Sequence, residues 1–116
     1  MNVQHFLQAI ERNGGGHYSL SEGILNPTKG YLSPVPRTME EFPYMDQEFL
    51  SAYVMKHIEE LALSQRYISA YRTAGTWSLN ISICLSKEAA TELAYVNGEE
   101  YVYNLCNGTH IEIFKC

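Results

Sequence analysis

The sequence has few basic residues. Only 8 of its 116 residues are Lys or Arg, against 13 Asp or Glu, which gives a net charge of −5 at pH 7. Non-specific affinity for nucleic acids comes from neutralising phosphates with cationic side chains, so we expect no direct binding to nucleic acid. The negative charge is also too small to favour a protein that mimics DNA.

Long hydrophobic runs are absent as well. No stretch approaches the roughly 20 apolar residues that a membrane-spanning helix needs, so we expect no membrane partner. Residues 1–13 have neither a basic start nor a continuous apolar run, and we expect no signal peptide there. Cysteine is scarce: Cys84, Cys106 and Cys116 form no CxxC pair. Reduced thiols in a cytoplasmic protein are the simpler interpretation.

The composition is that of a globular chain. Hydrophobic residues make up 46% of the sequence and charged residues 18%, which is enough apolar material for one core. We therefore predict a single domain that spans residues 1–116. Nine aromatic residues are tyrosine, against four phenylalanines and one tryptophan. Tyrosine is common both in strands and at protein interfaces.

The first half of the chain predicts two helices separated by irregular strands. The first helix ends at Asn13-Gly14, and its apolar positions are Val3, Phe6, Leu7 and Ile10. Residues 16–36 favour short strands and turns, and the prolines in GYLSPVP predict an edge strand or a loop. A loop over residues 37–45 leads to Asp46, which is expected to cap one helix with the apolar stripe Leu50, Val54, Ile58 and Leu61.

The second half predicts two hairpins around a short helix. Hydrophobic residues alternate strictly with smaller polar ones through TWSLNISICL, and RYISAYRT is its expected hairpin partner across Ala74-Gly75. Ser86 caps a helix that ends at residues 97–98, and Asn107-Gly108 joins the last two strands. This order predicts an α+β fold: an antiparallel sheet of about four to six strands built from hairpins, with two or three helices packed mainly on one face.

The triple glycine at residues 14–16 does not predict a phosphate-binding loop. Such loops place glycines after a strand and before a helix, so that the helix N-terminus faces the anion. Here the glycines follow a helix and precede an extended segment. The expected role is helix termination followed by a turn.

No constellation for catalysis or metal binding emerges from the sequence. The four histidines have no ligand spacing, and His57 beside Glu59 and Glu60 is best explained as a residue at the edge of a helix face. Ser19 and Ser21, close to His17, are best explained as turn residues. We therefore expect no enzyme, no metal and no cofactor.

Two groups of residues favour binding. In RYISAYR, strand alternation places Arg66 and Arg72 on one face and Tyr67 and Tyr71 on the other. Paired guanidinium groups near tyrosines are suited to an anionic ligand or a protein partner. The alternative is that both arginines form ion pairs with helix carboxylates.

The second group is the segment NPTKGYLSPVPR, with Lys29, Tyr31 and Arg37. Loops shaped by glycine and proline often carry binding residues on a rigid scaffold. The alternative is a purely structural turn and edge strand.

The order of segments resembles that of a group of small proteins encoded by bacteriophages, prophages and other mobile elements. The likeness rests on NPTKGYLSP ahead of a helix, and on RYISAYRTAGTWSLNISICLSKEAATELAYVNGEEYVYNLCNG after it. It is a likeness of pattern over most of the chain, without a catalytic signature. The segment VNGEEYVYNL departs from the pattern of the group, which more usually has Asn or Gln followed by aliphatic residues here. The resemblance implies an accessory protein that counters a host defence system in the host-cell cytoplasm.

Two functions from different classes follow. The first is a non-enzymatic phage or mobile-element accessory protein that binds and inhibits a host defence protein through Tyr- and Arg-rich surface. The second is binding or sequestering of a small anionic ligand such as a nucleotide, held between subunits by Arg66, Arg72, Lys29 or Arg37. A homo-oligomer is a further candidate, because half-covered sheets and edge strands favour pairing.

Overall fold

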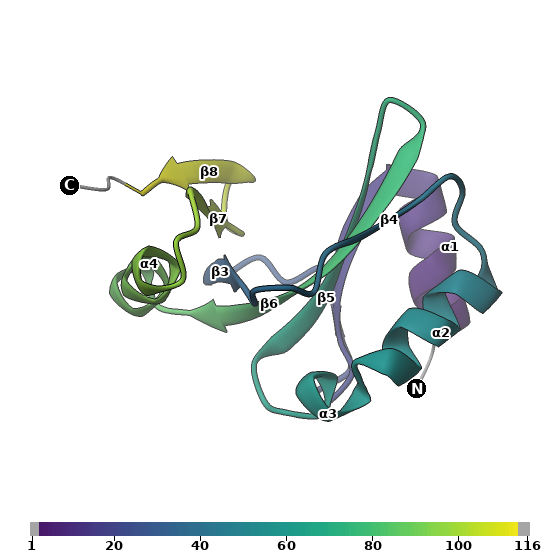
Figure 1. The fold of residues 1–116 in the computed structure, drawn as a ribbon, viewed down its shortest axis with the longest axis horizontal. Helices are drawn as coiled ribbons and strands as arrows, with labels where there is room; N and C mark the ends of the chain where they lie inside the picture. The colour runs from purple at the N-terminus through teal and green to yellow at the C-terminus, as the bar shows by residue number, and fades with distance from the viewer. Residues whose placement is uncertain (1–2, 114–116) are drawn as a thin grey trace.

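Residues 3–113, which the computed structural model describes, form one antiparallel sheet of eight strands with four helices (Figure 1). In chain order the elements are α1 (Val3–Asn13), β1 (Gly15–Ser19), β2 (Ile24–Leu25), β3 (Tyr31–Pro34), β4 (Glu40–Phe42), α2 (Gln47–Lys56), α3 (Ile58–Leu61), β5 (Arg66–Thr73), β6 (Thr76–Leu85), α4 (Lys87–Val96), β7 (Tyr101–Asn104) and β8 (Thr109–Glu112). The predicted α+β class is confirmed, whereas the predicted number of strands and helices is too low. Cys116 and the end of the last predicted strand lie outside the described residues.

The strands follow the order β2-β1-β5-β6-β3-β7-β8, and β4 also pairs with β6. The long β5–β6 hairpin forms the middle of the sheet, with Thr73 opposite Thr76. Its turn residues Ala74 and Gly75 have φ of 51° and 82°. Positive φ at both central positions is typical of the type I′ turn, whose twist matches that of the flanking strands. The predicted hairpin is confirmed.

The prediction for residues 30–36 is wrong. β3 lies between β6 and β7, in the interior of the sheet, and is neither an edge strand nor a loop. Pro34 is the last residue of β3 and pairs with Ser82, whereas β7 pairs only with Tyr31 and Leu32. Since no strand pairs with Pro34 on its other side, the missing proline N–H breaks no hydrogen bond there. Residues 40–42, expected in a loop, form β4.

The helix ends follow from local chemistry. Asp46 caps α2 by accepting a hydrogen bond from the Phe49 N–H at 2.8 Å, and Ser86 caps α4 in the same way. The single predicted helix beyond Asp46 is two helices, because the backbone leaves the α conformation at His57, with φ −113° and ψ 22°. Gly14, with φ of 76°, donates its N–H to the Ile10 carbonyl and ends α1.

The helices pack on one face of the sheet, as predicted. On the side of α1 and α2, the strands contribute Ile68, Ala70, Leu79 and Ile81 to a shared core. α4 packs against Val102 through Ala90 and Ala94, and Leu85 of β6 joins this cluster. Leu85 and Leu79 point to the same face of β6 by strand alternation, so α4 covers the same face as α1 and α2. Figure 1 shows α4 beside the β7–β8 hairpin, at the opposite end of the sheet from α1 and α2.

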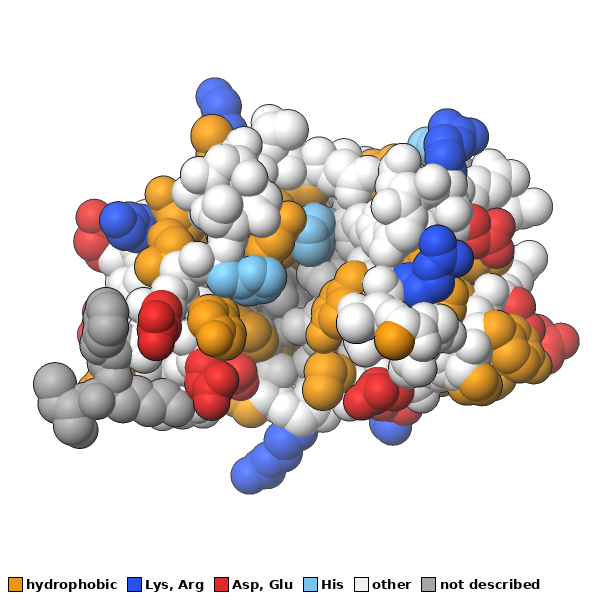
Figure 2. Space-filling model, turned by 90° about the horizontal axis from the view of Figure 1, so that it is seen from above, with side chains coloured by type: hydrophobic (Ala, Val, Ile, Leu, Met, Phe, Trp, Pro, Cys, Tyr) orange, Lys and Arg blue, Asp and Glu red, His pale blue; other side chains and the backbone are white. Residues whose placement is uncertain are grey.

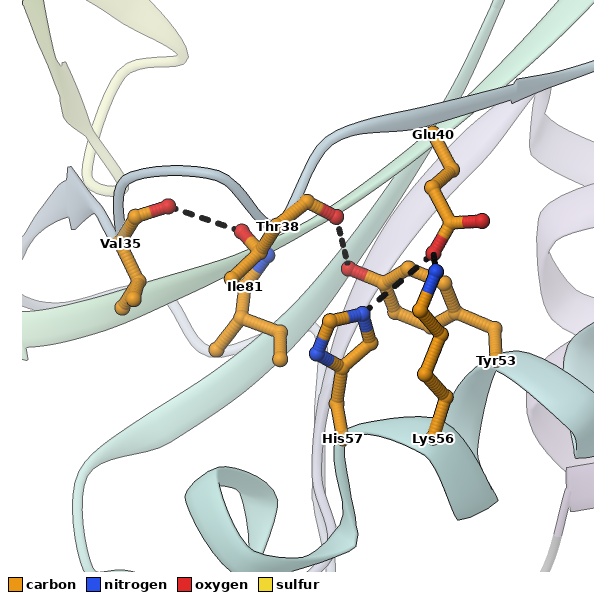
Figure 3. A network of polar contacts seen from close by, with 7 residues as sticks. All are labelled: Val35, Thr38, Glu40, Tyr53, Lys56, His57 and Ile81. Carbon is orange, nitrogen blue, oxygen red and sulfur yellow. Dashed lines mark hydrogen bonds and ion pairs between the residues drawn. The ribbon is translucent and has the colours of Figure 1, made fainter.

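A polar network ties the β3–β4 connection to the sheet and to α2 (Figure 3). The Thr38 hydroxyl donates to the Val35 carbonyl at 2.9 Å and accepts from the Ile81 N–H at 3.0 Å. The Thr38 carbonyl accepts from the Tyr53 hydroxyl at 2.7 Å. Burial of the Tyr53 phenol raises its pKa well above the usual range, so it stays protonated as a donor. The network holds the β3–β4 connection against β6 and α2.

Candidate functional site

The face of the sheet away from the helices is polar. Strand alternation on β5 and β6 turns Ser69, Asn80 and Ser82 to this side, and the register places Ser69 directly opposite Asn80. Tyr67 and Tyr71 share this face with them. At one end, Leu105 of the β7–β8 loop folds over the sheet and packs with Leu32 and Tyr67.

A cavity of about 1000 Å³ lies over this face. We call it the open-face cavity and define it by His17, Ser69, Asn80, Ser82, Tyr103 and His110. The three central-strand residues form its floor, and β1 and the β7–β8 hairpin form opposite walls. Figure 2 looks onto a face that is hollowed near the middle of the molecule, with histidine side chains beside the hollow.

Aromatic rings join the two walls. The rings of His17 and Tyr103 lie 5.4 Å apart between centroids, and the His110 ring lies 5.3 Å from that of Tyr103. Tyr101 adds a fourth ring, 5.6 Å from His110. His17 and Tyr103 meet although β5, β6 and β3 separate their strands in the sheet order. The sheet therefore curves strongly around the cavity.

His17 is held from two sides and is neutral. Its Nδ1 lies 2.8 Å from the Ser69 hydroxyl, and its backbone N–H donates to the Asn26 side-chain oxygen at 2.9 Å. Burial lowers the pKa of His17 to about 4, because the charged imidazolium would lose its hydration. At pH 7 the ring therefore offers a neutral hydrogen-bonding surface and no positive charge.

Asn80 has an amide that the fold leaves largely unused. Its Oδ1 is buried without a hydrogen-bond partner, and its Nδ2 reaches only the Ser82 hydroxyl, at 3.5 Å. An unpaired buried polar atom costs about 1–3 kcal/mol. The amide is therefore poorly satisfied within the fold, and a turn of the side chain toward the cavity would let a ligand pair with Oδ1.

The charge of the lining is negative. Glu99 and Glu100 lie at the cavity, and among the described residues 3–113 no Lys or Arg lines it. Because His17 is neutral, no cationic partner for an anion comes from β1 either. The cavity therefore favours neutral or positively charged groups over anions.

The Ser69–His17 contact has the distance of a nucleophile–base pair but lacks the other requirements. Ser69 is only 5% exposed, and the lowered pKa makes His17 a weak base at neutral pH. Ser69 lies on a central strand paired on both sides, so the surrounding backbone N–H groups are used in the sheet and not free to stabilise an oxyanion. Within residues 3–113, no three His, Cys, Asp or Glu side chains are placed to hold a metal ion.

The predicted arginines share a face, as strand alternation required, but they lie on the helix-covered side. Arg66 donates to Glu60 at 2.7 Å and to the Ser64 carbonyl at 3.0 Å. Arg72, six residues along β5, stacks over Trp77 with 5.5 Å from its guanidinium carbon to the ring. The two are not brought together in one site.

The other predicted residues are also dispersed. Lys29 and Arg37 are exposed in the loops on either side of β3, and Tyr31 packs against the α4 cluster. Tyr67 is buried among Leu32 and its neighbours. Of the seven residues, only Tyr71 lines the open-face cavity.

Sequence reasoning missed most of the cavity. The polar face of TWSLNISICL was visible and contains Asn80 and Ser82. His17 joins them only because β1 pairs with β5, which sets His17 opposite Ser69. No local sequence pattern predicts that pairing, since 52 residues separate His17 from Ser69.

Comparisons with protein-family models, with curated proteins and with solved structures each find no match to this chain. Among the helices in the described part of the chain, none is long and apolar enough to cross a membrane. The interpretation of function therefore rests on the geometry of the open-face cavity.

Proposed function

We propose that this chain is a binding protein for a small polar ligand without negative charge, held in the open-face cavity. The observation that carries the proposal is the lining. Neutral hydrogen-bonding groups, aromatic rings and two carboxylic residues surround about 1000 Å³, and the described part of the chain adds no Lys or Arg to this lining. This volume is at the upper end of the roughly 300–1,000 Å³ typical of small-molecule sites.

The floor supports binding over catalysis. Ser69, Asn80 and Ser82 stand on paired central strands, which hold side chains in fixed positions. Fixed polar groups reduce the entropy lost when a ligand binds. Positioning a ligand is the role that we propose for these residues, and the weak basicity of His17 is consistent with it.

The negative charge of the cavity lining changes the class of ligand that we expect. The alternative function drawn from the sequence was an anion held by Arg66, Arg72, Lys29 or Arg37, and these cations lie outside the cavity lining. Glu99 and Glu100 instead favour an amine or a neutral compound. The proposal therefore keeps small-ligand binding and replaces the anionic class.

A charge-matched fragment library tests the proposal. Amine, neutral and carboxylate members of each scaffold are screened by ligand-observed NMR against the wild-type protein, Asn80→Tyr and Glu92→Tyr. Asn80→Tyr fills the floor, whereas Glu92→Tyr adds the same side chain at an exposed position on α4. We expect amine and neutral hits that only Asn80→Tyr abolishes. Hits that are mostly carboxylates, or that survive Asn80→Tyr, would contradict the proposal.

Docking onto a host defence protein stays a prediction, as do a phage or mobile-element origin, a host-cell cytoplasmic location and a homo-oligomer. The end of α4 and the start of β7 expose Tyr95, Val96 and Tyr101, by 51%, 73% and 48%. Tyrosines are favoured where proteins meet. Contacts with such a partner would be sought on this surface first.

A further inference from the structure

We infer that the open-face cavity recognises a planar, uncharged heterocycle, such as a free nucleobase or nucleoside, through the side-chain amide of Asn80. The inference rests on the proposed function and names the class of ligand. Its starting point is that the fold leaves both ends of this amide poorly satisfied: the buried Oδ1 has no partner, and Nδ2 makes only a 3.5 Å contact with Ser82, so the side chain gains hydrogen bonds by turning toward a ligand in the cavity.

An amide presents a donor and an acceptor side by side. This pair matches a ligand edge on which an acceptor and an N–H donor are adjacent, and asparagine reads adenine in this bidentate way. Exchange of the two amide atoms of Asn80 would leave the same donor–acceptor pair, so the match does not depend on their assignment. Since Asn80 stands on the central strand β6, the sheet fixes its backbone position at the floor of the cavity.

The walls suit a flat ring. Tyr103 and His110 contribute ring surface from the β7–β8 hairpin, and His17 contributes an uncharged ring from β1. Stacking of a base on an aromatic side chain is favourable and tolerates any base. The cavity volume of about 1000 Å³ leaves room for a sugar beside the base.

The same lining disfavours a phosphate. Glu99 and Glu100 border the cavity, and its lining, as far as residues 3–113 form it, has no Lys or Arg to pair with a phosphate oxygen. A nucleoside should therefore bind more tightly than its 5′-monophosphate. This order distinguishes the inference from nucleotide sequestering.

Calorimetric titration of the full chain tests the inference. The probes are adenosine, guanosine, cytidine and uridine, their 5′-monophosphates, and methyl glucoside as a neutral compound without a flat ring. We expect at least one nucleoside to bind, with its monophosphate at least 10-fold weaker. Asn80→Ala should weaken nucleoside binding at least 10-fold without lowering the thermal midpoint. Ser33→Ala is the matched control, because Ser33 also buries an unpartnered oxygen but does not line the cavity; its affinity should be unchanged.

Three outcomes would overturn the inference. The first is nucleoside binding that Asn80→Ala leaves intact, and the second is tighter binding of the monophosphate. The third is no nucleoside binding while methyl glucoside or an amine fragment binds in an Asn80-dependent way, which would leave the proposed function standing. If neither these probes nor the fragment library bind, both the inference and the proposed function fail.

Discussion

The imidazole of His17 and the phenol ring of Tyr103 lie 5.4 Å apart between centroids, although three strands separate β1 from β7 in the sheet. This contact across a curved sheet encloses the polar face of the central hairpin. It also explains the environment of His17, whose partly buried ring contacts Ser69 and Tyr103. The fold thus builds a ring-lined cavity with a polar, uncharged floor from strands distant in sequence.

The burial of His17 predicts a pH dependence of stability. Its folded-state pKa of about 4 lies below the ordinary 6.5, so between these values the unfolded chain binds a proton that the folded protein does not. Stability should fall as the pH drops from 6.5 toward 4, and this group should have no effect above that window. The loss is on the order of 3 kcal/mol. Urea unfolding at several pH values should show a flatter profile for His17→Gln than for wild type; parallel profiles would contradict the assignment.

Two buried serines predict opposite effects of the same substitution. Ser33 and Ser19 are both fully buried, but the Ser33 hydroxyl has no partner, whereas that of Ser19 contacts Ser21 and the Glu22 N–H. Ser33→Ala should raise the free energy of unfolding by about 1 kcal/mol and Ser19→Ala should lower it by a similar amount. Chemical denaturation measures both. If both variants change the free energy of unfolding by the same amount in the same direction, the hydrogen bonds of these serines do not determine their effect on stability.

Thr38→Val should destabilise the fold by about 2 kcal/mol or more. The substitution keeps the side-chain volume but leaves the Ile81 N–H without its acceptor and the Val35 carbonyl without its donor (Figure 3). Thr91→Val on α4 is the control, because the Thr91 hydroxyl only donates to carbonyls of its own helix. The thermal midpoint of Thr38→Val should fall well below that of Thr91→Val. Similar midpoints would show that the hydrogen bonds of Thr38 do not stabilise the fold.

The β5–β6 turn predicts a stabilising change. Ala74 adopts φ of 51°, which disfavours a residue with an ordinary side chain, and Gly75 adopts 82°. Ala74→Asn should stabilise the protein by about 1 kcal/mol, because asparagine tolerates this conformation and Asn-Gly favours the type I′ turn. Gly75→Ala should destabilise it by a similar amount. If Ala74→Asn lowers the unfolding midpoint, the turn assignment is wrong.

Local chemistry was enough to predict much of the fold. Asp46 and Ser86 cap the helices expected of them, and the alternation from Trp77 to Leu85 correctly divides a covered face from a polar one. β3 was misassigned because a proline marks an edge strand only where the strand on its nitrogen side would need a hydrogen bond from that position. Here β7 stops short of it.

The site was largely beyond sequence reasoning. Charge drew attention to Arg66 and Arg72, but their partners Glu60 and Trp77 serve the covered side of the sheet. The cavity instead depends on neutral residues whose proximity follows from strand order and sheet curvature. In the sequence, Ser69 and Asn80 are ordinary positions on the polar face of two strands. Only the fold places His17 and Tyr103 beside them.

The most direct test of the central claim is a map of backbone amide chemical shifts while a neutral or amine hit from the fragment library is added to ¹⁵N-labelled protein. We predict that the largest changes fall on β1, β5, β6 and the β7–β8 hairpin, around His17, Asn80 and Tyr103. Changes confined to the helix-covered side, around α1 and α2, would contradict the claim that the open-face cavity is the binding site.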